Sequence, residues 1–130
     1  MKITGIDHLV LRAHDQQRLV DFYTDVLGLT VEKRQDAIGL VQLRAGSCLI
    51  DIVAVNSVLG RMGGAGPGAE GRNLDHFCLA VEGFDLETVK THLTAHGVEV
   101  GQEGVRYGAG GHGLSVYLTD PEGNGLELRG

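Results

Sequence analysis

The sequence contains no tryptophan, only two prolines and two cysteines, and 5% aromatic residues. It has no apolar run approaching the roughly 20 residues that a membrane-spanning helix needs, so we expect no membrane partner. Basic residues do not cluster and the net charge is −6, which argues against a nucleic-acid partner. Met1–Thr4 shows no signal-peptide pattern, and Cys48 and Cys78 lie in apolar segments typical of free thiols. Together these features predict a cytoplasmic protein.

Glycine is abundant, with 21 residues, which indicates many turns and bulges. Six glycines surround Pro67 between residues 56 and 73, a stretch without a strong period that we interpret as a linker or a lid. The chain is 42% hydrophobic and 22% charged, as expected of a globular protein. Its 130 residues suit one domain or two small halves that share a core.

The segments on either side of this stretch repeat one pattern. Leu74–Leu79 echoes Ile6–Leu11, and each is followed by a helix that begins after an aspartate N-cap, Asp15 or Asp85. We therefore predict an α+β fold of two βαβββ modules, about 1–55 and 74–130, within a single domain 1–130. The expected strands are 3–13, 29–33, 39–44 and 48–55, then 74–79, 98–102, 114–119 and 126–129.

Four titratable side chains lie within these otherwise apolar strands. His8 and His76 hold equivalent places in the first strand of each module, and Asp51 and Glu127 lie in the last. A carboxylate among apolar neighbours is costly unless it is paired or bound to a metal. Alone, each residue could be a hydrogen-bonded core histidine or a solvent-facing acid. Their repetition favours one divalent ion, either Ni, Zn, Co, Mn or Fe(II), bound by all four.

Four short motifs stand out along the chain: Ile6–His8, Phe22–Leu29, Leu74–His76, and Asp120–Asn124 leading to Leu126–Leu128. Together with the βαβββ repeat they resemble the vicinal oxygen chelate superfamily, which includes glyoxalase I, methylmalonyl-CoA epimerase, fosfomycin-resistance transferases, extradiol dioxygenases and bleomycin-binding proteins. Within it, the chain is most similar to small uncharacterised glyoxalase-domain proteins. The resemblance covers nearly the whole chain outside the glycine-rich stretch, and it implies that the modules form a curved, cup-shaped mixed sheet.

By this resemblance, His8, His76 and Glu127 occupy metal-ligand positions. Asp51 falls where glyoxalase I carries Glu and the epimerase carries Gln. Because Asp is one methylene shorter, it would reach the ion through some strand adjustment or through a water. Without Asp51, the site would have two His and one carboxylate, as favoured by Fe(II) oxygenases.

The resemblance implies a lyase or isomerase whose small substrate chelates the metal through adjacent oxygens, with Glu127 or Asp51 as the base. The alternatives are an Fe(II) ring-cleaving dioxygenase and a metal-free small-molecule binding or resistance protein. The lack of tryptophan and the retention of four ligand-type residues disfavour the last. A homodimer is expected, with the metal within one chain or between subunits. The candidate substrate-binding residues are Arg12, Tyr117, Arg129 and His112.

Overall fold

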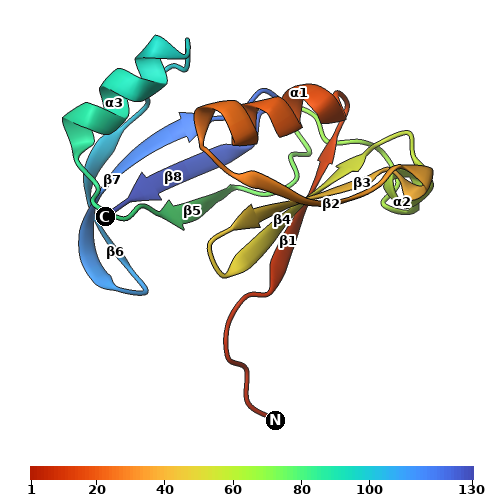
Figure 1. Cartoon of the computed structure of the whole chain (residues 1–130), viewed down its shortest axis with the longest axis horizontal. Helices are drawn as coiled ribbons and strands as arrows, with labels where there is room; N and C mark the ends of the chain where they lie inside the picture. Colours follow the sequence, from red (N-terminus) through yellow and green to blue (C-terminus); the bar gives the residue numbers. More distant parts are fainter. The chain divides into compact units, whose positions relative to one another are not determined.

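The computed structural model describes all residues from Met1 to Gly130, which form two compact units, Met1–Asn73 and Leu74–Gly130 (Figure 1). Each unit contains one four-stranded mixed sheet, and the strands follow the same order in both. The α+β class and the two βαβββ modules predicted from the sequence are confirmed. None of the helices is long and apolar enough to cross a membrane.

In the first unit, the outer strand β1 (His8–Ala13) runs parallel to β4 (Cys48–Ala54), and the remaining pairs are antiparallel. Helix α1 (Gln16–Asp21) continues into the π-helical turn η1 (Phe22–Val26). The Asp15 side chain caps α1 by accepting from Arg18 N. The other elements are β2 (Thr30–Gln35), the 3-10 turn η2 (Asp36–Ile38), β3 (Leu40–Ala45) and α2 (Val58–Met62).

The second unit repeats this arrangement. Strand β5 (His76–Ala80) runs parallel to β8 (Gly125–Arg129), which is antiparallel to the long strand β7 (Gly111–Thr119). Strand β6 (Glu103–Gly108) completes the sheet, and α3 (Leu86–Ala95) is its helix. As predicted, the helix begins after the cap Asp85, whose side chain accepts from Thr88 N at 2.9 Å.

The two faces of each sheet have different roles. Successive side chains of a strand point to opposite faces of the sheet. On one face the side chains are apolar and are buried beneath the helix of the same unit. The opposite face carries His8 and Asp51 in the first unit, and His76 and Glu127 in the second. The buried side chains include Leu11, Leu19, Tyr23, Val41, Leu43, Ile50 and Ile52, and in the second unit Leu93, Val116, Leu118, Leu126 and Leu128.

The structure differs from the predicted secondary structure at three places. The first strand begins at His8 instead of residue 3. The residues before His8 form only two hydrogen bonds with β4, in which Asp7 O accepts from Leu49 N at 3.0 Å and Ile6 O accepts from Cys48 Sγ at 2.9 Å.

The strand predicted over 98–102 does not form. Gly101 and Gln102 each share one backbone hydrogen bond with Tyr117 of β7, and the strand paired with β7 is instead Glu103–Gly108. The glycine-rich stretch 56–73 contains α2, where Ser57 caps the helix by accepting from Gly60 N.

Candidate metal-binding site

The register places each histidine beside its carboxylate in the same way in both units. Asp51 of β4 is the strand partner of Val10, two residues after His8 on β1. Glu127 of β8 is likewise the partner of Cys78, two residues after His76 on β5. Because residues i and i+2 of a strand share a face, each histidine and its carboxylate project from the same face of neighbouring strands. The structure thus contains two equivalent histidine–carboxylate pairs.

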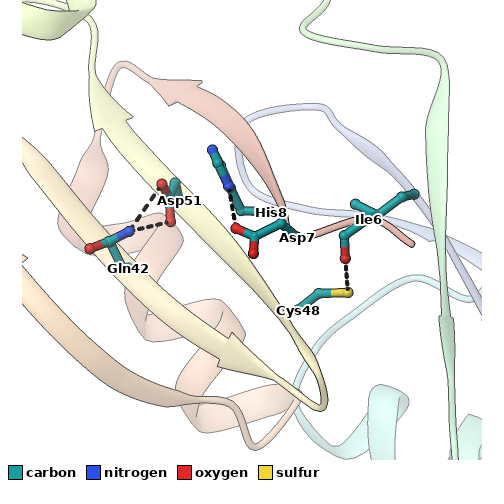
Figure 2. Close-up of polar contacts among 6 residues, drawn as sticks. All are labelled: Ile6, Asp7, His8, Gln42, Cys48 and Asp51. Carbon is teal, nitrogen blue, oxygen red and sulfur yellow. Dashed lines mark hydrogen bonds and ion pairs between the residues drawn. The ribbon is translucent and has the colours of Figure 1, made fainter. Parts of the chain in front are cut away.

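In the first unit, Asp51 is buried, and an amide holds it in place. The Gln42 side chain, opposite Asp51 on β3, donates from Nε2 to Oδ1 at 3.1 Å and to Oδ2 at 3.2 Å (Figure 2). His8 is half-exposed, and its Nδ1 lies 2.8 Å from Asp7 Oδ1. Gln42 therefore fixes the carboxylate, while the Asp7 contact leaves the Nε2 edge of His8 turned away from Asp7.

In the second unit, Glu127 is 6% exposed and no amide or arginine holds its carboxylate. His76 Nε2 lies 3.6 Å from Glu127 Oε2, and His76 Nδ1 lies 2.6 Å from Asp75 Oδ1. The Tyr117 ring meets the His76 ring edge-on, with centroids 5.6 Å apart. A buried carboxylate with a histidine beside it is a suitable oxygen donor for a divalent cation.

An aspartate precedes each histidine and binds its Nδ1. This contact selects the tautomer with the proton on Nδ1, so that the Nε2 lone pair is free to ligate a metal. This role of Asp7 and Asp75 was not predicted from the sequence. The signal was present as an Asp-His dipeptide in both modules. Gln42 was also missed, because only the β3–β4 register brings it to Asp51.

The imidazole and carboxylate groups are of the right chemical type for a divalent ion, but each unit brings together only one histidine and one carboxylate. No group of three or more His, Cys, Asp and Glu side chains suited to a metal is gathered in the structure. Each unit supplies one imidazole nitrogen and one carboxylate, the ligand types of Zn, Ni, Co, Mn and Fe(II) sites. Burial and the nearby Glu127 raise the pKa of Cys78 to about 11, so its thiol stays protonated and is a poor ligand at neutral pH.

The hydrogen bond that His8 Nδ1 donates to Asp7 and the charge of Asp51 raise the pKa of His8 above its ordinary 6.5. We expect an NMR titration of the metal-free protein to show this, and Asp7→Asn to lower the His8 pKa. Because a metal binds neutral imidazole, protons should compete with it as the pH falls through the raised pKa. Asp75→Asn is the matched control in the other unit. An unchanged His8 pKa in Asp7→Asn would contradict the assigned contact.

The candidate substrate-binding residues differ in their placement. Tyr117 and Arg129 project from the sheet face that carries His76 and Glu127. His112 has the opposite parity on β7 and packs edge-on against Tyr107, with centroids 5.1 Å apart, which removes geometric support for a role beside His76.

The Arg12 side chain forms its hydrogen bonds within the first unit. Its guanidinium donates to Gly64 O at 3.2 Å and Ala65 O at 2.9 Å, while Asn73 forms two hydrogen bonds with the Arg12 backbone. A Cβ at Gly63 would lie 2.6 Å from Arg12 Nη1, so the guanidinium would have to shift if any larger residue stood there. Arg12 therefore anchors the glycine-rich stretch to β1.

Comparison with known proteins assigns the family. The model of the Glyoxalase/Bleomycin resistance protein/Dioxygenase superfamily matches residues 5–128, and the chain belongs to this superfamily. The glyoxalase domain-containing protein RDO1 of Mycosarcoma maydis is 32% identical over 130 residues, which cover 98% of this chain and 69% of that protein.

Solved structures share the whole fold. An integron cassette protein from the mobile metagenome of V. cholerae is 27% identical, with a TM-score of 0.77 over 99% of this chain and 96% of that chain. A virulence protein from Salmonella typhimurium is 25% identical, with a TM-score of 0.82 over 99% and 98%. A lactoylglutathione lyase from Agrobacterium tumefaciens has a TM-score of 0.73 over 99% and 95%, and at 22% identity it shows a shared fold alone.

Proposed function

We propose that the chain is a divalent-metal-dependent lyase or isomerase of this superfamily. In this proposal His8, Asp51, His76 and Glu127 bind one ion, within one chain or between the subunits of a homodimer. A small substrate chelates the ion through adjacent oxygens. The observation that carries the proposal is the equivalent histidine–carboxylate pair in both units, each with an aspartate on the histidine Nδ1.

The surroundings of the two carboxylates suggest different roles. Gln42 donates to both oxygens of Asp51, which favours a fixed ligand. Glu127 lacks such an amide and has a longer side chain. We therefore assign it a second role: once released from the ion, it would act as the general base that removes a proton from the carbon beside the substrate carbonyl. When bound, the ion would supply Lewis-acid polarisation of that carbonyl oxygen. Tyr117, in contact with His76, would orient the substrate.

One observation favours a second candidate. Because Gln42 occupies both oxygens of Asp51, the ligands left without such a partner are His8, His76 and Glu127. Two histidines and one carboxylate with open positions form the ligand set of Fe(II) oxygenases. The second candidate is therefore an Fe(II) ring-cleaving dioxygenase.

We further propose that the protein acts in the cytoplasm as a homodimer. The apolar side chains Val105 and Tyr107 of β6 are 62% and 78% exposed and share one face of the strand, which suits a contact with a second copy. Both cysteines are free thiols, as is usual in a reducing compartment.

The test is the metal content of protein purified without chelator, followed by titration of the metal-free form with Ni²⁺, Zn²⁺, Mn²⁺ and, without oxygen, Fe²⁺. We expect one ion for each set of four ligands. Tight binding of Ni²⁺ or Zn²⁺ that air does not affect would support the lyase or isomerase, and a requirement for Fe²⁺ with loss of activity in air would support the dioxygenase. If no ion binds, the proposal fails and a metal-free binding protein is the remaining candidate.

A further inference from the structure

Two histidines outside the proposed metal site lie one helical turn apart at the end of α3. His92 is in the last turn of the helix, His96 is its C-cap, and both residues are exposed. The His96 N–H donates to His92 O at 3.3 Å, so the helical hydrogen bonding extends to His96. Because residues i and i+4 of a helix are neighbours on its surface, the two imidazoles project from one face of α3.

The two imidazole rings are close together. Their centroids are 4.4 Å apart, and the ring planes are inclined at 43°. Two imidazoles that bind one ion at neighbouring positions, with metal–nitrogen distances of about 2.0–2.1 Å, have centroids roughly 4.5–5 Å apart. The helix therefore holds these rings at a separation that suits a shared ion.

A backbone contact selects the tautomer of His96. Its Nδ1 lies 2.9 Å from His92 O. A carbonyl oxygen only accepts hydrogen bonds, so Nδ1 carries the proton, and Nε2 of the neutral imidazole carries the lone pair. Histidines that bind metals are commonly oriented in this way, with one ring N–H donated to an oxygen while the other nitrogen ligates the ion.

The charges along α3 also favour a cation at this end. The C-terminal end of a helix carries a partial negative charge. The one lysine of the helix, Lys90, is ion-paired with Glu87 at 3.3 Å and with Glu103 at 2.9 Å, so its charge is balanced. The helix contains no arginine. A cation bound at His92 and His96 would therefore meet little repulsion from α3 itself.

We propose that His92 and His96 form a second divalent-cation site, separate from the four proposed ligands. Imidazole nitrogens suit Zn²⁺, Ni²⁺ and Cu²⁺, and the Irving–Williams order places Cu²⁺ above the other two. Two protein ligands leave the remaining positions to water, so we expect weaker binding than at a site with four protein ligands. The inference does not rest on the proposed function, because neither histidine is one of its ligands.

The test follows the ring C–H NMR signals of the histidines while the metal-free protein is titrated with Zn²⁺, which is diamagnetic. We expect the signals of His92 and His96 to shift together along one saturation curve, because both bind the same ion. His14 and His112 are internal controls and should not follow this curve. Unshifted signals, or separate saturation curves for His92 and His96, would overturn the proposal.

Two variants distinguish a shared ion from binding to single histidines. An ion held by one histidine meets the second intramolecularly, so His92→Ala should raise the dissociation constant measured at His96 by at least about tenfold. The matched control combines Thr91→His with His92→Thr, which keeps two histidines and the net charge but turns one of them to another side of the exposed helix surface. Its affinity should fall to that of His92→Ala, and wild-type affinity in this control would refute a shared ion.

The same titration separates this inference from the proposed function. Metal content measured on the whole protein would combine the ions at both sites, whereas the NMR signals report each site by itself. Saturation at His92 and His96 without any response of His8 and His76 would support the second site and refute the metal-dependent function. A response of His8 and His76 with unshifted His92 and His96 signals would do the reverse.

Discussion

Replacement of His76 with alanine should lower the affinity for a divalent ion by on the order of a hundredfold or more. Loss of groups that only support a ligand commonly reduces metal affinity 10–100-fold, so the loss of a ligand should have at least this effect. The measurement is a competition titration of the metal-free variant against a chelator of known affinity. Glu127→Gln, which removes the negative charge and keeps the shape, should give a comparable loss.

The control is His112→Ala, which removes an imidazole from the same unit but from the opposite face of β7. It should bind metal as the wild type does. Far-UV circular dichroism of both histidine variants shows whether the fold persists, and since His76 is half-exposed we expect it to do so. Equal affinities in the wild type and in folded His76→Ala would refute the assignment of His76 as a ligand.

The repeated pattern allowed the fold and the candidate ligands to be predicted from the sequence. Two copies of one strand and helix pattern gave the βαβββ order, and the parity of each strand set which side chains share a face. The helix caps Asp15 and Asp85 were local signals that tertiary contacts did not override. The equivalent placement of His8 and His76 followed from the repeat alone.

Contacts that depend on register could not be predicted in the same way. Strand β6 forms over Glu103–Gly108, because pairing with β7 outweighs the weak local preference of a segment with two glycines. The hydrogen bonds from Gln42 to Asp51 and from Arg12 to Gly64 likewise join segments whose alignment is fixed only in the folded sheet. His112 was predicted to bind substrate without knowledge of its strand, and its parity on β7 became known only with that register.

Replacement of Asp120 with alanine should lower the free energy of unfolding by about 3 kcal/mol, because it leaves several buried donors without an acceptor. Asp120 is 4% exposed, and its Oδ1 accepts from the backbone N–H groups of Glu122 and Asn124, both at 2.9 Å. Its Oδ2 accepts from Asn124 Nδ2 at 2.8 Å. Urea unfolding followed by far-UV circular dichroism measures the change.

The matched control is Asp36→Ala, which removes an exposed carboxylate and should change the unfolding free energy by less than about 0.5 kcal/mol. Asp120→Asn should be intermediate, because the amide keeps one oxygen as an acceptor but turns a donor toward the remaining groups. Since the turn at Asp120 leads directly into β8, the same hydrogen bonds that stabilise the unit also set the position of Glu127. A loss below about 1 kcal/mol in Asp120→Ala would mean that water replaces the carboxylate in this turn, and that Glu127 is positioned by its strand pairing alone.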